Sequence, residues 1–322
     1  MSYYTERWIL IGEEGTWGTW KTPDTFPTYL LSWDATTTEH RAEEEVIGGD
    51  RDSRSRVWLH REVVARWEEQ LVSSKVFYLA LGSHSTGDTA SPYRHTISPA
   101  STVPSLSIYR GLTPTYTGES ATLSLGYMGM KVDTCELNFE AGEDVTVELN
   151  FAGKDTTIPT ALGKPDIDFS IEPFTYSHCS VDVITPNGTV NVSHLRRGNI
   201  TIDNNLEAKV TSGSGSYKPV EIRERGLRVS GRLVVFAPLG TLSSVILNRN
   251  ECTLKVYMIG DDANMGTIEI TVNNIVFDEL SDELRGLEQV EMELPFSAKP
   301  STGGDVIQIV HTTAYSWNNM PW

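Results

Sequence analysis

Apolar and polar residues alternate along much of this chain, the pattern of strands with one buried and one solvated face. Four long runs of this kind lie at Val57–Glu69, Val145–Ala152, Leu227–Phe236 and Thr267–Phe277. Shorter runs predict further strands at Tyr29–Thr36, Ser105–Tyr109, Lys131–Glu140, Asn199–Leu206, Cys252–Ile259 and Val290–Ser297. The sequence therefore predicts a mostly β protein with antiparallel sheets.

Helical patterns are few. Ser73–Leu81 predicts a short helix, with a serine cap at its start and Gly82 just past its end. Leu239–Asn248, which follows Pro238, predicts a second. Each follows directly after a long predicted strand.

One strand pattern occurs twice. VTVELNFAGKDTT begins at Val145 and VEMELPFSAKPST begins at Val290, 145 residues later, and six of the thirteen positions are identical. Alternating strands resemble one another, so this pair alone is compatible with chance. The same order of strands and helix recurs around both copies, however, which favours a duplication. We expect two tandem units, residues 1–160 and 161–322.

Four polar segments predict loops. Gly82–Pro104 and Arg110–Gly126 are rich in Ser, Thr, Pro and Gly. Thr36–Arg56 and Thr211–Gly226 join strands and are long for hairpin connections, which usually take about 2–5 residues. The charges in these two segments suit either contact with another copy or a mobile loop. The candidate contact residues are Glu39, Arg41, Glu43, Glu44, Glu45, Asp50, Arg51, Asp52, Arg54, Lys218, Glu221, Arg223 and Arg225.

Composition and charge restrict the function. The 322 residues carry a net charge of −17, which argues against a surface that grips nucleic acid. The three cysteines are scattered and show no zinc spacing. Nucleotide-binding loops, hydrolase elbows and histidine metal motifs do not occur. We therefore expect neither an enzyme nor a cofactor, and the N-terminus lacks the pattern of a signal peptide.

Several segments together resemble a known family. GEEGTWGT begins at Gly12, YRHTISP at Tyr93 and PSLSI at Pro104; YMGMKVDTCELNFEAGEDVTVELNFAGKD begins at Tyr127 and TIDNNLE at Thr201. In their order and spacing, over most of residues 10–240, they resemble the tail tube proteins of long-tailed phages and related archaeal viruses.

This resemblance implies that each of the two units is a β-sandwich or split barrel with a short flanking helix. It also implies a structural role without membrane contact. Such proteins form rings that stack into a hollow tube in the virion tail, assembled in the host cytoplasm. The implied partners are further copies of the chain, a tape measure protein in the lumen, and tail terminator and baseplate or tail-tip proteins. Viral DNA passes through without specific binding. Single-unit members are associated with six-fold rings, so a two-unit chain is expected to form a trimer with pseudo-six-fold symmetry, the alternative being a hexamer.

The acidic face of the strands fits such a lumen. Opposite the apolar side chains lie Glu148, Glu269, Glu291 and Glu293, which are candidates to line the lumen and repel DNA. An ordinary solvated outer face is the alternative.

Two other functions remain open. One is a β-sandwich that binds carbohydrate or attaches to a host through tryptophans near the termini, at Trp17, Trp20, Trp317 and Trp322. The other is a β-fold hydrolase with a carboxylate pair that sequence spacing cannot reveal.

Overall fold

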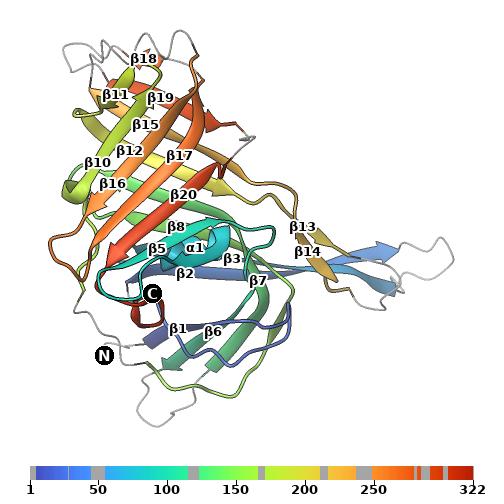
Figure 1. Ribbon diagram of the computed structural model, residues 1–322. Coiled ribbons are helices and arrows are strands. Elements are labelled where there is room, and N and C mark those ends of the chain that lie inside the picture. The colour runs from blue at the N-terminus through green and yellow to red at the C-terminus, as the bar shows by residue number, and fades with distance from the viewer. Residues whose placement is uncertain are drawn as a thin grey trace, which may run out of the picture.

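The structure is a computed structural model (Figure 1). The described residues are 5–27, 29–44, 55–114, 123–165, 171–210, 217–236, 249–278, 281–283, 291–299 and 304–321. They are mostly strand, as the sequence predicts, with one short α-helix among them.

Strands dominate both halves of the chain. The first half contains β1 (Thr5–Glu13), β2 (Leu30–Glu44), β3 (Ser55–Gln70), α1 (Lys75–Leu81), β4 (Gly82–Thr86), β5 (Tyr93–Pro99), β6 (Leu106–Pro114), β7 (Leu123–Glu140), β8 (Thr146–Gly153) and β9 (Asp155–Thr157). The second half contains the 3-10 turn η1 (Tyr176–His178), β10 (Cys179–Thr185), β11 (Gly188–Asn191), β12 (Leu195–Asp203), β13 (Leu206–Lys209), β14 (Glu221–Glu224), β15 (Arg228–Phe236), β16 (Cys252–Ile259), β17 (Thr267–Phe277), β18 (Ser281–Glu283), β19 (Glu291–Ala298), β20 (Ile307–Thr313) and the turn η3 (Trp317–Asn319).

Eight strands form one continuous antiparallel layer, which we call the wall. Its lateral order is β2–β3–β8–β7–β12–β15–β19–β18. The second layer contains the runs β1–β6–β7–β9 and β11–β10–β16–β17–β20–β5–β4. The long strands β7 and β17 belong to both layers, so the polypeptide turns from one layer into the other along them.

One continuous hydrophobic core contains residues of both halves, including Trp67 and Phe151 from the first and Leu254 and Phe296 from the second. It is filled by the alternating apolar side chains on which the strand predictions rest. On β8, for example, buried and half-buried residues alternate without interruption. The predicted mostly β sandwich is confirmed.

The two halves pair their strands in the same order. In the first half the order is β1–β6–β7–β8–β3–β2. In the second half it is β10–β16–β17–β19–β15–β12. The halves meet where β7 pairs with β12 and where β5 pairs with β20 (Figure 1).

The predicted elements agree well with the structure where apolar alternation is strong. All ten predicted strands are present with shifted ends, and the helix predicted at Ser73–Leu81 is α1, with Gly82 at its C-cap in the left-handed conformation at φ 86°. The helix predicted at Leu239–Asn248 lies outside the described residues. The strands that were not predicted are β1, β4, β5, β9, β10, β11, β13, β14, β18 and β20.

The four loop predictions are wrong over most of those residues of the four segments that the structure describes. Instead of a loop from Thr36 to Arg56, β2 and β3 continue as a paired arm, and residues 45–54 lie outside the described residues. Within Gly82–Pro104 lies the β4–β5 hairpin, and β6 and β7 extend into Arg110–Gly126. In Thr211–Gly226, β14 pairs with β13. These strands lack a clear alternation of apolar and polar residues, or they are positioned by pairing with strands that are distant in the sequence. Local alternation therefore does not reveal them.

Candidate functional site

The polar face of the wall is the first candidate surface. Core-facing residues of β8 are buried and alternate with polar residues on the opposite side. Residues directly opposite one another on neighbouring strands lie on the same face of a sheet. Glu68 on β3, Glu148 on β8 and Glu136 on β7 therefore form one row of carboxylates across three strands.

Glu148 and Glu293 are predicted lumen residues that lie on this face beside arginines. The Glu148 carboxylate is 2.6 Å from the Arg66 guanidinium. That of Glu293 is 3.5 Å from Arg232 and 3.7 Å from Arg197. Neighbouring arginines thus compensate part of the predicted negative charge.

Glu291 is a third predicted lumen residue on this face, whereas Glu269 lies elsewhere. Glu291 lies on β19 of the wall and forms an ion pair with Arg196. Glu269 lies instead on the part of β17 that pairs with β16 and β20, 2.5 Å from Lys255. The structure therefore brings Glu148, Glu291 and Glu293 to one layer and leaves Glu269 in the other.

Carboxylates still outnumber arginines among the described residues of this face. By the strand registers, the carboxylates are Asp34, Glu62, Glu68, Glu136, Glu140, Glu148, Asp203, Glu291 and Glu293, and the basic residues are Lys131, Arg66, Arg197, Arg228 and Arg232, with Arg196 of the β12 bulge paired to Glu291. The face therefore favours repulsion of polyanions over their binding.

The second candidate surface consists of the two protruding hairpins, the β2–β3 arm and the β13–β14 ribbon (Figure 1). An ion-pair cluster joins the arm to the loop end of the ribbon. Arg61 lies 2.5 Å from Glu39 and 2.5 Å from Asp155, and Lys218 also pairs with Asp155. Two of the predicted contact residues, Glu39 and Lys218, thus belong to one cluster.

This cluster is strongly ionic. Burial opposes ionisation of Asp155, but hydrogen bonds from Lys218 and Arg61 outweigh it and lower the pKa of this carboxyl. The Arg61 backbone N–H also donates to the Tyr217 carbonyl over 2.8 Å. The loop end of the ribbon, which carries Tyr217 and Lys218 beyond the last β13–β14 pair, is therefore fixed to the arm by charge and by backbone hydrogen bonding.

The other predicted contact residues are not part of this cluster. Glu221 pairs with Arg223 at 2.6 Å, and Arg225 pairs with Glu207 across the ribbon. Arg41, Glu43 and Glu44 are strand residues of β2 whose side chains are not described; Glu45, Asp50, Arg51, Asp52 and Arg54 lie outside the described residues.

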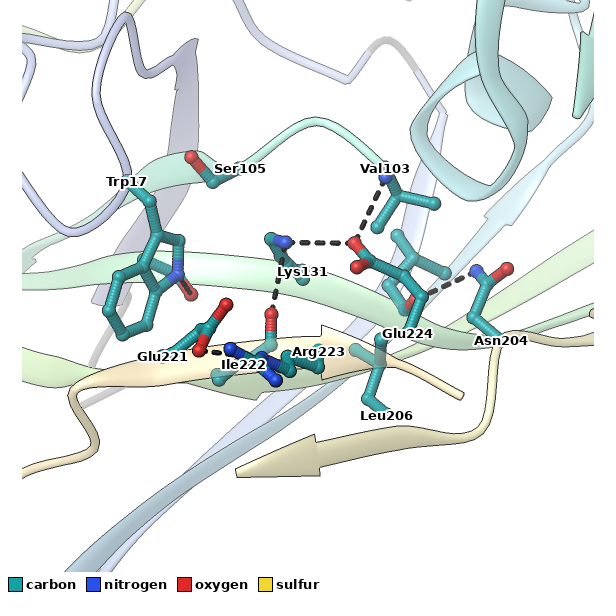
Figure 2. A network of polar contacts seen from close by, with 12 residues as sticks. Trp17, Val103, Ser105, Lys131, Asn204, Leu206, Glu221, Ile222, Arg223 and Glu224 are labelled. Carbon is teal, nitrogen blue, oxygen red and sulfur yellow. Dashed lines mark hydrogen bonds and ion pairs between the residues drawn. The ribbon is translucent and has the colours of Figure 1, made fainter. Parts of the chain in front are cut away.

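A polar network anchors the ribbon to the first half of the chain, and sequence reasoning did not find it (Figure 2). The Lys131 ammonium lies 2.8 Å from the Glu224 carboxylate and donates to the Ile222 carbonyl. Glu224 also accepts the Val103 N–H at 3.1 Å, and the Asn204 amide donates to the Val132 carbonyl at 2.9 Å. Lys131 is more than 90 positions away from both Ile222 and Glu224, so no sequence motif marks this network.

The GEEGTWGT segment has a structural role around Glu14, which is buried. Its carboxylate accepts backbone N–H groups from Gly18 at 2.7 Å and Gly129 at 2.9 Å, and hydroxyl groups from Ser105 and Ser107. One carboxylate thus satisfies four donors and holds the chain start against β6 and β7.

The tryptophans near the termini pack against the protein. The Trp17 indole N–H donates to the Gly129 carbonyl, and Trp20 packs on the cluster that contains Tyr109. Trp317 stacks on His84 with ring centroids 3.5 Å apart. Trp322 lies outside the described residues. Three of the four tryptophans are thus engaged in internal contacts, which does not favour carbohydrate binding through them.

A serine and a histidine make contact, but in the interior. The Ser74 hydroxyl lies 3.1 Å from Nδ1 of His311, and Nε2 of His311 donates to the Met265 carbonyl at 2.9 Å. Both side chains are almost fully buried, at 0% and 1% exposure. Substrate therefore has no access to this pair, and its polar atoms are already hydrogen-bonded.

The described part of the chain offers neither a clustered metal site nor a membrane-spanning helix. It contains no group of three or more His, Cys, Asp and Glu residues placed to hold a metal ion. No helix there has the length and apolarity needed to cross a bilayer.

Comparisons with known proteins agree with the strand architecture. The family model described as "Phage tail tube protein" matches residues 8–315. A search of curated proteins found no similar sequence. The match covers nearly the whole chain, and members of this family are structural components of a virion tail rather than known enzymes. The chain therefore belongs to the phage tail tube protein family.

Proposed function

We propose that three copies of this chain form a ring, that each copy contributes two homologous units, and that the rings stack into the tail tube. The observation that carries this proposal is the strand order repeated in the two halves. Two units per chain make three copies sufficient for six wall segments, which supports a trimer over a hexamer.

The registers of the repeated strands support a duplication in detail. Tyr127 and Met130 on β7, moved by 145 positions, correspond to Val272 and Ile275 on β17. Each pair flanks a β-bulge against the preceding strand, β6 in one half and β16 in the other. Inside these bulges Gly129 has φ 67° and Asn274, 145 positions later, has φ 53°. β-Bulges and left-handed residues are local features that chance rarely places at the same offset.

The wall is proposed to enclose the lumen with its polar face inward. An excess of carboxylates on this face favours passage of DNA without adhesion, because each basic contact to phosphate would retard it. The arginines beside Glu148 and Glu293 moderate the charge, so the proposed lumen is weakly rather than strongly negative. Glu269 is proposed to lie outside it.

The β2–β3 arm and the β13–β14 ribbon are proposed to contact the next ring. They extend from the body on the same side (Figure 1), and the ribbon carries Glu221, Arg223 and Arg225 of the candidate contact residues. Family membership further supports a tape measure protein in the lumen, tail terminator and baseplate or tail-tip proteins at the ends, and assembly in the host cytoplasm, in a long-tailed phage or a related archaeal virus.

Electron microscopy of the purified protein tests the ring. We expect stacked rings or tubes whose averages show three-fold symmetry with six similar lobes, and a ring mass three times the 35.7 kDa of the chain. Six-fold symmetry with two lobes per subunit would exclude the trimer. Monomers that persist at high concentration across a range of salt would exclude the tube itself.

A further inference from the structure

The β13–β14 ribbon corresponds to the outer part of the β2–β3 arm, pair by pair. Within the wall, Thr36 lies opposite Val64, and Thr201 lies opposite Ser230 at the matching place, 165 and 166 positions later. With these two shifts, the arm pairs 41 with 58, 42 with 57, 43 with 56 and 44 with 55 become 206 with 224, 207 with 223, 208 with 222 and 209 with 221. All four of the latter pairs occur in the ribbon. The ribbon is therefore the counterpart of the arm in the second half of the chain.

The joint between the wall and the hairpin also agrees, but its conformation differs. In the arm, the pairing skips Leu59, so one strand carries one residue more than the other. The second half has the same excess of one residue between the wall pair of Asp203 with Arg228 and the first ribbon pair. There, however, Asn205 and Gly226 have φ 47° and 141°, and β13 and β14 form a sheet separate from the wall. The joint is thus continuous in the arm and interrupted in the ribbon.

The ribbon leans across the wall toward the arm. Along the wall, β3 and β12 are separated by β8 and β7, which corresponds to about 14 Å at the usual spacing of strands. The Tyr217 carbonyl nevertheless accepts the Arg61 N–H of β3 at 2.8 Å. A cavity of about 550 Å³ is lined by Val210 of the ribbon segment and by Val64 of the wall, and these side chains are 39% and 41% exposed. The ribbon therefore covers the wall without packing tightly on it.

Two groups of ion pairs hold the ribbon in this position. Lys131 of β7 contacts Glu224 of β14 at 2.8 Å, and Lys218 beside the ribbon pairs with Asp155 of β9 (Figure 2 shows the first pair). We call these two pairs the latch. Few apolar side chains assist, because the buried residues in the described part of the ribbon are Pro219 and Ile222.

The arm lacks the first pair of the latch. The counterpart of Glu224, 166 positions earlier, is Trp58. The counterpart of Lys131, at the shift of 145 positions that relates β7 to β17, is Val276. Neither residue carries a charge, so the arm has no equivalent ion pair at this place.

The residues of the joint differ as well. His40 and His60 of the arm take the places of Asn205 and Gly226, and their imidazole rings stack with centroids 4.0 Å apart. Ring contacts across neighbouring strands stabilise their pairing. Glycine has no side chain to contribute and adopts positive φ readily. The arm joint therefore favours a straight hairpin, and the ribbon joint permits a bent one.

We propose that the ribbon is a second arm, which the latch holds bent across the wall, and that breaking the latch lets it swing out about the joint of Asn205 and Gly226. The inference rests on the two-unit organisation of the proposed function and does not require the ring. During the swing β13 and β14 remain paired with each other, and the cavity between ribbon and wall opens.

Amide hydrogen exchange of a variant without the latch tests the swing. In Lys131→Met with Asp155→Asn, the ribbon loses both ion pairs while the shape of residue 155 is kept. The amides of Arg61 and Val103 donate to ribbon acceptors. We expect both to exchange about ten-fold faster or more, because the swing removes their acceptors.

An amide inside the ribbon distinguishes a swing from unfolding. The Val220 N–H donates to the Lys209 carbonyl at 2.9 Å, so a hairpin that moves as one body keeps this bond. Its exchange should stay within about two-fold of the wild type. If Val220 accelerates as much as Arg61, the ribbon unfolds instead of swinging and the proposal is wrong.

A distance measurement supplies an independent readout. Spin labels on Glu62→Cys and Val210→Cys lie across the same cavity, and their separation should increase when the latch is removed. Single-cysteine variants measure labelling of the native thiols, of which Cys135 and Cys252 are buried. An unchanged separation in the variant without the latch would overturn the proposal.

Two further variants serve as matched controls. Arg225→Met removes an ion pair with Glu207 that lies within the ribbon, so it should change neither the separation nor the exchange of Arg61. Asn205→His with Gly226→His installs the joint of the arm. Without the latch, this change should narrow the distribution of separations, because the joint then pairs as in the arm. Release of the ribbon by Arg225→Met would contradict the latch.

Failure of this inference and failure of the ring are distinguishable. If the ribbon swings out in the variant without the latch but the wild type forms no ring, the latch stands and the proposed ring is wrong. If the wild type forms rings and the ribbon of the variant stays in place, the latch is wrong and the ring stands.

Discussion

At the scale of single residues, the core holds several titratable groups whose ionisation burial disfavours. Glu69 is 3% exposed and accepts the Trp67 indole N–H at 3.0 Å, and burial raises the pKa of its carboxyl to about 8. His311 is 1% exposed, and burial lowers the pKa of its imidazole to about 4. Both groups are therefore neutral near pH 7, and each makes stability depend on pH in an opposite direction.

Glu69→Gln is predicted to remove a loss of stability at high pH. The carboxyl keeps its proton in the folded state up to about pH 8 but loses it near pH 4.5 when unfolded. Its contribution is therefore complete below pH 4.5 and is lost as pH rises through 8, at about 1.4 kcal/mol per pH unit. Glutamine retains an acceptor for Trp67, so the wild type should lose stability relative to Glu69→Gln between pH 5 and pH 8. Urea unfolding at both pH values measures this, and parallel changes in the two proteins would contradict it.

His311→Gln is predicted to act in the opposite direction. The unfolded imidazole takes up a proton below pH 6.5, whereas the folded one resists protonation down to about pH 4. Its contribution is therefore complete above pH 6.5 and declines as pH falls. His95, directly opposite on β5, adds to this resistance.

The glutamine amide of this variant can still donate to the Met265 carbonyl. We expect the wild type to lose about 2 kcal/mol relative to His311→Gln between pH 7 and pH 5, at about 1.4 kcal/mol per unit. Thermal unfolding at the two pH values measures the difference. Equal losses in both proteins would show that His311 does not titrate as described.

At the scale of elements, the ribbon illustrates how distant residues position a polar hairpin. β13 and β14 contribute few buried side chains, and their burial patterns are mostly exposed or half-buried. Their position depends instead on the pairing of Lys131 with Glu224 and on the cluster around Asp155.

Lys131→Met is predicted to loosen the ribbon. The side chains of Lys131 and Glu224 are 11% and 18% exposed, so removing one partner leaves a mostly buried charge unpaired. We expect a loss on the order of 2 kcal/mol, below the range for fully buried pairs, and faster amide exchange in β14. The control is Arg225→Met on the same ribbon, whose pair with Glu207 is 58% and 49% exposed and should contribute less than about 1 kcal/mol. Equal effects of the two variants would exclude Lys131 as the anchor.

The elements also show which local patterns predict structure. Strands such as β8 and β15 fill the core, and their apolar alternation revealed them. β5 was interpreted as loop because its serine, threonine and proline content resembles one, yet it pairs with β4 and, from 210 or more residues away, with β20. The outer part of β2, Thr36–Glu44, is polar at almost every position, so no apolar alternation reveals it.

At the scale of the whole molecule, the continuous core and the wall make the two halves one body. The β7–β12 and β5–β20 pairings cross between the halves, and core residues of both lie in one cluster. The prediction that belongs to this scale is three-fold symmetry, because a wall that already repeats once within the chain needs three copies to supply six segments. A ring mass of any other multiple would reject it.

The sequence by itself determined the β class, the position of most core strands, the family resemblance and the repeated order of elements, because burial imposes a period of two on each strand. Only the tertiary structure decided which carboxylates share a face, which arginines lie beside them, and how the arms and the ribbon are anchored. Those arrangements depend on strand register and on contacts between residues tens to hundreds of positions apart. Local alternation records which face a side chain occupies, but not which strand lies beside it.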